Sequence, residues 1–175
     1  MTVEELMEKD KNFNQSLFTS RANNMVKKLY NSITLNELNT VDHFVSDKVF
    51  NKFKKMQEDA INNGERLIFD QVNVDTLIKD IDIVDNTYKI TCNITCKYCK
   101  YYLDKNGNVT RGNNTDRSTV IHIVTLCKKV GVERDNVARC FGCGTTFNIN
   151  ETGICPTCGR VFDLEEFDYY IDSFE

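Results

Sequence analysis

Long apolar runs are missing from this chain. No stretch approaches the roughly 18 consecutive apolar residues that a membrane-spanning helix requires. The first residues, MTVEELMEKDK, are acidic and polar and lack the apolar core of a secretory signal. These absences predict a cytoplasmic protein that can at most lie at a membrane surface. In that reducing compartment the eight cysteines are expected to be metal ligands or buried thiols, not disulfides.

Signatures of catalysis are also missing. The chain has no glycine-rich phosphate loop and no Ser/His/Asp set, and its two histidines, His43 and His122, lie far apart in sequence. We expect both to be structural. Asp80, Asp82 and Asp85 could perform acid–base chemistry, but a solvated strand edge is the favoured interpretation. We therefore assign no catalytic and no cofactor-binding residue and expect a non-enzymatic protein.

Charge is unevenly distributed along the chain. Residues 86–130 carry 8 bases and 2 acids, whereas residues 131–175 carry 3 bases and 9 acids. The basic middle is a weak indication of an anionic partner, although a solvated sheet face explains it as well. The cysteine-rich segment 137–163 has two bases and two acids, too few clustered cations for phosphate contacts, so nucleic acid is not an expected partner.

Apolar periodicity divides the chain into helices followed by strands. Steps of three and four over residues 13–33 predict one long helix. The spacing Thr34 to Glu37 resembles a capping box and predicts a short second helix, and a third is expected between Ser46 and Gly64. The period then changes to two, with a phase slip near Thr76 that suggests a bulge. This order predicts an α+β domain whose helices pack on a curved antiparallel sheet.

Three strands and a turn are expected after residue 85. Residues 88–103 alternate, residues 104–108 have turn chemistry, and residues 118–127 are apolar on both faces, as in a central strand. The segment DLEEFDYYIDSF near the C-terminal end is a candidate last strand.

The stretch CNITCKYC has the C-x3-C-x2-C spacing of radical S-adenosylmethionine enzymes, which bind an iron–sulfur cluster. On an extended strand, however, Cys92 and Cys96 lie about 13 Å apart at roughly 3.3 Å per residue, and Cys99 points the opposite way. An iron–sulfur enzyme using these three cysteines is thus a remote alternative. We expect Cys92, Cys96 and Cys127 to fill the core as small apolar side chains. A second zinc site from Cys96, Cys99 and Cys127 remains open.

A stronger metal signal lies near the C-terminal end. Cys140, Cys143, Cys155 and Cys158 form two C-x2-C pairs, each followed directly by glycine. Glycine allows the positive φ that turns backbone amides toward the sulfurs, so two such turns can present four thiolates as a tetrahedron. The spacing predicts a zinc ribbon that holds one structural Zn²⁺ with no ligand position left for water.

An aromatic and basic cluster precedes the turn at residues 104–108. Tyrosines favour a membrane interface and lysines attract anionic lipid, but packing on a sheet face is the simpler interpretation. The cluster consists of Tyr98, Tyr101 and Tyr102 with Lys97, Lys100 and Lys105.

The N-terminal region resembles the Tim44-like domain family. Its members open with an Asp-x-x-Phe element, here Asp10 and Phe13, followed by a helix, a short connector, here NELNTV, and a segment similar to VSDKVFNKF. The similarity extends over about residues 10–175. Where relatives usually show W-x-L in the last strand, this chain has Tyr169 and Tyr170. Some bacterial relatives are similar in a further respect, because they insert a four-cysteine ribbon before that strand.

The resemblance implies a cone-shaped fold similar to nuclear transport factor two and a non-enzymatic adaptor role in membrane association or protein translocation. We expect a flexible N-terminus at 1–11, a Tim44-like domain formed by 12–136 plus 162–175, and a zinc ribbon inserted at 137–161. The expected partner is a protein segment or an anionic membrane surface, bound through a concave sheet. The alternative is a small-molecule-binding or enzymatic cone-fold protein.

Overall fold

The computed structural model describes residues 1–130, 137–140, 142–148, 155–159 and 169–175. Four helical segments come first: α1 (Val3–Lys9), α2 (Gln15–Thr34), the 3-10 helix η1 (Leu38–Phe44) and α3 (Asp47–Asn62). The strands follow: β1 (Arg66–Val84), β2 (Thr87–Leu103), β3 (Val109–Gly112), β4 (Ser118–Lys129), β5 (Val137–Arg139), β6 (Thr146–Asn148) and β7 (Tyr170–Phe174). This order confirms the predicted α+β class.

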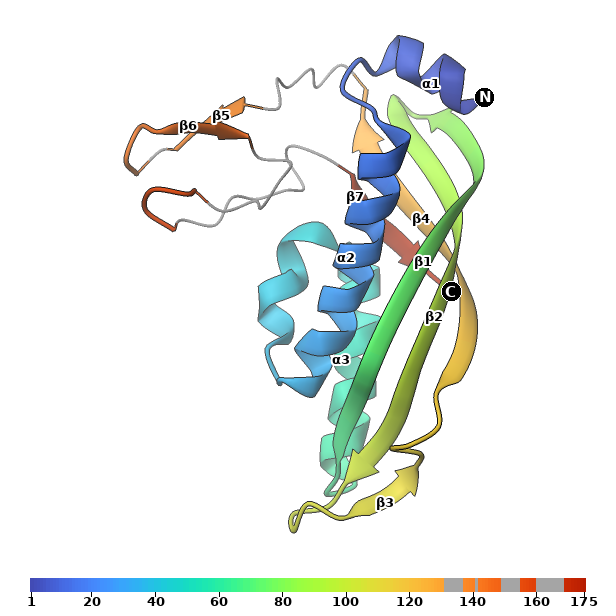
Figure 1. Ribbon diagram of the computed structural model, residues 1–175, viewed down its shortest axis with the longest axis vertical. Coiled ribbons are helices and arrows are strands. Elements are labelled where there is room, and N and C mark those ends of the chain that lie inside the picture. Colours follow the sequence, from blue (N-terminus) through green and yellow to red (C-terminus); the bar gives the residue numbers. More distant parts are fainter. Residues whose placement is uncertain (131–136, 141, 149–154, 160–168) are drawn as a thin grey trace.

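The main sheet is antiparallel, with strand order β1-β2-β4-β7 and with β3 paired to β2. β4 is therefore a central strand, as its apolar composition predicts. Figure 1 shows that the sheet is curved and that α2 and α3 lie against its concave side. The expectation of a concave sheet open to a partner is consequently wrong, because these helices occupy that side. Of the described elements, no helix covers the convex face.

Local hydrogen bonds set the ends of α3 where the sequence predicts them. The Ser46 hydroxyl accepts a hydrogen bond from an amide of the first turn at 3.3 Å. At the other end Gly64 has a φ of 71°, and its amide donates to Ile61 at 2.9 Å. The Glu65 amide donates to the Ala60 carbonyl, also at 2.9 Å. This pair of bonds is a Schellman motif, which needs a left-handed residue and so explains the glycine.

The predicted capping box at residues 34–37 is wrong. Thr34 is the last residue of α2, and its hydroxyl bonds both the amide and the carbonyl of Phe69 in β1, at 2.9 and 3.1 Å. Glu37 precedes η1 without a side-chain cap, and η1 is a 3-10 helix. The Thr34 hydroxyl thus bonds the sheet instead of capping the start of the next helix, as the sequence pattern predicts.

A capping box instead begins the chain. Thr2 and Glu5 bond each other's backbone amides with their side chains, at 3.1 and 2.7 Å, and so start α1. Leu6 on this helix is fully buried. The segment 1–11, which we expected to be flexible, therefore contains a helix that packs on the core.

Aromatic rings fill the space between the helices and the sheet. The centroid of Tyr30 lies 4.7 Å from that of Phe69, 5.1 Å from Tyr98 and 5.8 Å from Phe53. Burial raises the pKa of the Tyr30 hydroxyl above its usual value, so this group is a neutral hydrogen-bond donor. It lies 3.1 Å from Nε2 of His122.

The long strand β1 is irregular at two places. Its register with β2 shifts between Asp70 and Asn73 and again between Ile78 and Asp80. Thr76, where the sequence suggests a bulge, lies in regular pairing between the two shifts. Bulges bend a strand and increase its twist, which fits the curvature of the sheet.

A buried ion pair joins the first loop to the sheet. Lys128 Nζ of β4 lies 2.9 Å from Asp10 Oδ2, and both side chains are less than a tenth exposed. The Tyr169 hydroxyl donates to the same carboxylate oxygen at 3.3 Å. Three distant parts of the chain therefore meet at Asp10, the acidic residue of the Asp-x-x-Phe element.

Candidate metal centre

The first cysteine pair lies in a turn between β5 and β6, which pair as a short antiparallel hairpin. Gly144 has a φ of 75°, and its amide donates to the carbonyl of Cys140 at 2.9 Å. The Cys140 amide donates in turn to the carbonyl of Thr145, and the Gly142 amide lies 3.4 Å from the Cys140 sulfur. The turn thus directs backbone N–H groups to the sulfur, as the glycine spacing predicts.

The second pair repeats this geometry. Gly159 also has a φ of 75°, and its amide donates to the carbonyl of Cys155 at 2.9 Å. In each pair the first cysteine is buried and the second is exposed. Cys140 and Cys155 are the buried ones, and Cys143 and Cys158 are the exposed ones. Two local turns of the same kind therefore face each other.

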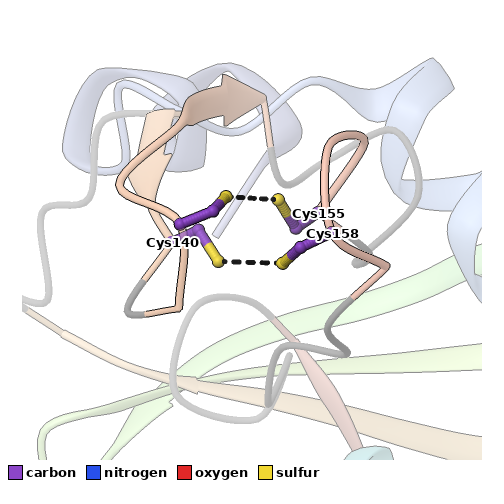
Figure 2. Close-up of side chains that lie close together, drawn as sticks. Cys140, Cys155 and Cys158 are labelled. Atoms are coloured by element: carbon purple, nitrogen blue, oxygen red, sulfur yellow. Dashed lines mark hydrogen bonds between the residues drawn. The ribbon is translucent and has the colours of Figure 1, made fainter.

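The four sulfurs converge between the two turns. The Sγ atoms of Cys140, Cys143, Cys155 and Cys158 all lie within 4.8 Å of one another. Across the gap, Cys140 is 3.5 Å from Cys158 and Cys143 is 3.6 Å from Cys155 (Figure 2). A tetrahedral zinc ion with Zn–S bonds of about 2.3 Å separates its sulfurs by about 3.8 Å. The cluster therefore has the size of a closed four-thiolate metal site.

The surroundings of the sulfurs favour thiolates, the form that binds metal. A hydrogen bond with the Thr145 hydroxyl, 3.2 Å away, and another with its backbone lower the pKa of Cys143 to about 6. A backbone hydrogen bond at Cys143 lowers the pKa of Cys140 as well. Thiolate anions are stabilised by such donors. Thr145 was not singled out from the sequence, although its place next to Gly144 is the signal that could have indicated it.

The earlier cysteines do not converge. Cys92 and Cys96 are fully buried in the main core. Cys127 of β4 pairs with Lys89 of β2, and Lys89 lies seven residues before Cys96 on that strand. At about 3.3 Å per residue, Cys127 is therefore roughly 23 Å from Cys96. Cys99 is buried too but does not belong to that core cluster.

These thiols behave as the apolar side chains that we expected. Burial raises the pKa of Cys92 to about 12 and those of Cys96 and Cys127 to about 11, so all three stay protonated at neutral pH. In the described part of the chain, the only group of three or more side chains placed to hold a metal is the one formed by Cys140, Cys143, Cys155 and Cys158. Neither the second zinc site nor the iron–sulfur arrangement is formed.

The aromatic and basic cluster is divided between the two faces of the sheet. Tyr98 is buried against Phe69, and the Lys100 ammonium lies 5.9 Å from the same ring. Lys97, one position before Tyr98, is exposed. Because neighbouring residues of β2 point to opposite faces, the cluster does not form one continuous patch.

The other polar candidates are separate as well. His122 contacts Tyr30, whereas His43 lies 4.0 Å from the adjacent Asp42. Asp80 and Asp82 are exposed at the edge strand β1, and Asp85 lies in the turn after it with a φ of 49°. Within residues that the structure describes, these groups make no shared acid–base site.

Comparison with known proteins agrees with the N-terminal resemblance. None of the described helices has both the length and the apolar character to cross a bilayer. A search of curated proteins finds no match. The Tim44-like domain model matches residues 1–137, ending just before the four cysteines and leaving the candidate metal centre outside the match. This chain therefore belongs to the Tim44-like domain family.

Proposed function

We propose that this protein is a non-enzymatic adaptor that binds a protein segment or an anionic membrane surface through its sheet. The Tim44-like family supports a binding role associated with membranes or translocation. The observation that carries the proposal is the convex sheet face. Leu77, Ile121 and Ile123 are 62%, 63% and 52% exposed there. Leu77 and Ile123 both pair with Asn93, so their apolar side chains lie in one row across the sheet.

The aromatic packing around Tyr30 favours an adaptor over an enzyme. The rings of Phe53, Phe69 and Tyr98 fill the space beside Tyr30 between the helices and the sheet, which a substrate there would need. The small-molecule alternative has one supporting observation, a cavity of about 430 Å³ with a carboxylate and a guanidinium in its wall. Its lining residues are Met56, Asp59, Ala60, Asn62, Asn63, Tyr102 and Arg111.

We further propose that Cys140, Cys143, Cys155 and Cys158 hold one structural Zn²⁺. The closed cluster and the lowered thiol pKa values support this assignment. Zinc prefers four thiolates in structural sites, and such a site has no position for a reacting water. The ribbon at 137–161 would then be a small module within a domain formed by 12–136 plus 162–175. We propose a cytoplasmic location, at or near a membrane surface.

Three measurements test the proposal: capture of a partner, turnover of a small molecule, and metal content. The full chain, immobilised through a tag, is challenged with cell extract and separately with phosphatidylserine-containing vesicles. Capture of a specific protein or of vesicles is expected, and both should be reduced when Leu77 and Ile123 are changed to serine. Turnover of a small molecule at the cavity, abolished by Asp59→Asn, would contradict the adaptor assignment. Metal analysis by mass spectrometry should find about one zinc per chain, and iron with sulfide would contradict the metal assignment.

A further inference from the structure

The cavity of about 430 Å³ lies between the end of α3 and the strands β2 and β3. Figure 1 shows these elements together at one end of the molecule. α3 lines the cavity with one face, since Met56, Asp59 and Asn63 recur at steps of three and four residues. The strands contribute Tyr102 of β2 and Arg111 of β3. A cavity of this volume is in the range of pockets that bind small molecules.

The sheet sets the position of Arg111. Gly112 has a φ of 86°, and a Cβ at this residue would meet the Lys100 carbonyl, so glycine allows β3 to lie close to β2. In this register Arg111 pairs with Tyr102. The guanidinium carbon of Arg111 lies 3.8 Å from the centroid of the Tyr102 ring. Stacking on the ring therefore holds the plane of the guanidinium at the cavity wall.

Glu65 occupies one edge of this guanidinium. Arg111 Nε lies 3.3 Å from Glu65 Oε2, and Arg111 Nη2 lies 3.2 Å from Glu65 Oε1. Hydrogen bonds from the Thr110 hydroxyl and from Arg111 lower the pKa of Glu65, so this carboxyl group is ionised at neutral pH. No described residue bonds Nη1 of Arg111. The pair with Glu65 thus fixes the guanidinium and leaves its Nη1 side available to a second carboxylate.

Asp59 brings the opposite charge to the same cavity. It lies in the last turn of α3, which contains no basic residue to offset the negative end of the helix dipole. Lys55, one turn earlier, makes no ion pair with Asp59, and neither does any other residue that the structure describes. An ammonium group bound beside Asp59 would stabilise both the carboxylate and the helix end. The side chains of Asn62 and Asn63 add amide oxygens that can accept from it.

Part of the cavity wall is apolar. Ala60 is 1% exposed, and Met56 and Tyr102 pack against the hydrophobic core. Asp59, Glu65 and Arg111 together carry one negative charge, which disfavours a phosphate or another ligand of net negative charge. A ligand that matches the whole wall has an ammonium, a carboxylate and a short apolar side chain.

We propose that this cavity binds an apolar α-amino acid. The ammonium lies at Asp59, the carboxylate at Nη1 of Arg111, and the side chain against Met56 and Ala60. This site goes beyond the adaptor function, because it uses none of the exposed apolar residues of the convex sheet face. A free amino acid is distinguished from the end of a protein chain, since a chain end carries only one of the two charged groups.

The first experiment compares ligands on the unchanged full chain by isothermal titration calorimetry. Leucine should bind, whereas leucine amide, which lacks the carboxylate, and N-acetyl-leucine, which lacks the ammonium, should each bind at least about fivefold more weakly. Glycine should also bind more weakly, by about fivefold or more, because it has no side chain to cover the apolar wall. Absence of binding at leucine concentrations up to ~10 mM, or equal binding of N-acetyl-leucine or leucine amide, would overturn the proposal.

Two substitutions then test each charged contact against the matching ligand. Asp59→Asn should weaken leucine and leucine amide by about tenfold and leave N-acetyl-leucine within about twofold, since that ligand has no ammonium to lose. Arg111→Gln should weaken leucine and N-acetyl-leucine and leave leucine amide within about twofold. Glu58→Gln, which changes the neighbouring acid outside the cavity wall, is the matched control and should alter none of the three. An equal loss for all three ligands would show a distorted cavity and would overturn the assignment of these contacts.

The outcomes separate this site from the proposed function. If leucine binds with the expected ligand dependence but the chain captures neither protein nor vesicles, the amino-acid site holds and the adaptor role is wrong. If the chain captures partners but leucine does not bind, the adaptor role holds and the amino-acid site is wrong.

Discussion

Removing the carboxylate of Asp10 should be among the most damaging single changes in this chain. The substitution Asp10→Ala leaves Lys128 as a buried ammonium without its partner, since the two groups are 2.9 Å apart and less than a tenth exposed. Breaking such a pair from one side costs about 3–5 kcal/mol, because the remaining charge is desolvated and unpaired. The hydrogen bond from the Tyr169 hydroxyl to Asp10 is also lost, which adds about 1 kcal/mol. We therefore expect a loss of roughly 4–6 kcal/mol in the free energy of unfolding.

Urea denaturation followed by circular dichroism measures this loss directly. For a chain of this length, each kcal/mol corresponds to about 2–4 °C in melting temperature, so thermal melts should fall by roughly 8–24 °C. The matched control is Glu58→Ala, which breaks the exposed pair with Lys54 at 3.9 Å and should cost at most about 0.5 kcal/mol.

A double substitution tests the reasoning itself. Asp10→Leu with Lys128→Met removes both charges and leaves no buried ion, so most of the lost stability should return. If Asp10→Ala costs less than about 1 kcal/mol, or the double variant is as unstable as the single one, the ion pair does not hold the first loop to the sheet as we infer.

Three further predictions follow from separate features. Cys155→Ser should lower bound zinc to well under one ion per chain in mass spectrometry, and full retention of metal would remove this residue from the ligand set. Burial lowers the pKa of His122, so the folded protein favours its neutral form. The contribution of His122 to the free energy of unfolding should therefore be fully present above about pH 6.5 and should fall as the solution becomes more acidic. His122→Gln should make the urea midpoint less dependent on pH in this range. Gly112→Ala places a Cβ against the backbone of β2 at a φ of 86° and should lower the free energy of unfolding by several kcal/mol. Gly107→Ala has a φ of 80° but open space around it, so it should cost about 1 kcal/mol. Similar melting temperatures for the two variants would contradict the close contact between Gly112 and β2.

The parts of the fold that sequence alone could predict depend on local patterns. The alternation along β2 and the spacing of apolar residues in α2 follow from strand and helix periods, so the class and the face of each cysteine could be inferred. The cysteine cluster was predictable for a similar reason, because each C-x2-C-Gly turn forms its own geometry within a few residues. Only the meeting of the two turns needs tertiary structure.

The features that sequence could not predict depend on distant partners. Nothing near Thr34 indicates that its hydroxyl bonds a β1 residue 35 positions away. Asp10 and Lys128 are separated by 118 positions, so neither residue alone distinguishes a buried ion pair from a surface charge. The pairing of β4 with β7 likewise joins two strands that are far apart in the chain.

The place of β7 in the chain has a consequence for synthesis of the protein. Residues 130–169, which include the cysteine turns, separate β4 from the strand that pairs with it in the finished sheet. At translation rates of roughly 5–20 residues per second, a ribosome takes about 2–8 s to make that segment. During this interval the part of β4 that β7 later pairs with, Val124 to Cys127, lacks that partner strand in the nascent chain. The nascent domain is therefore most prone to aggregation, and most accessible to chaperones, just before β7 is synthesised.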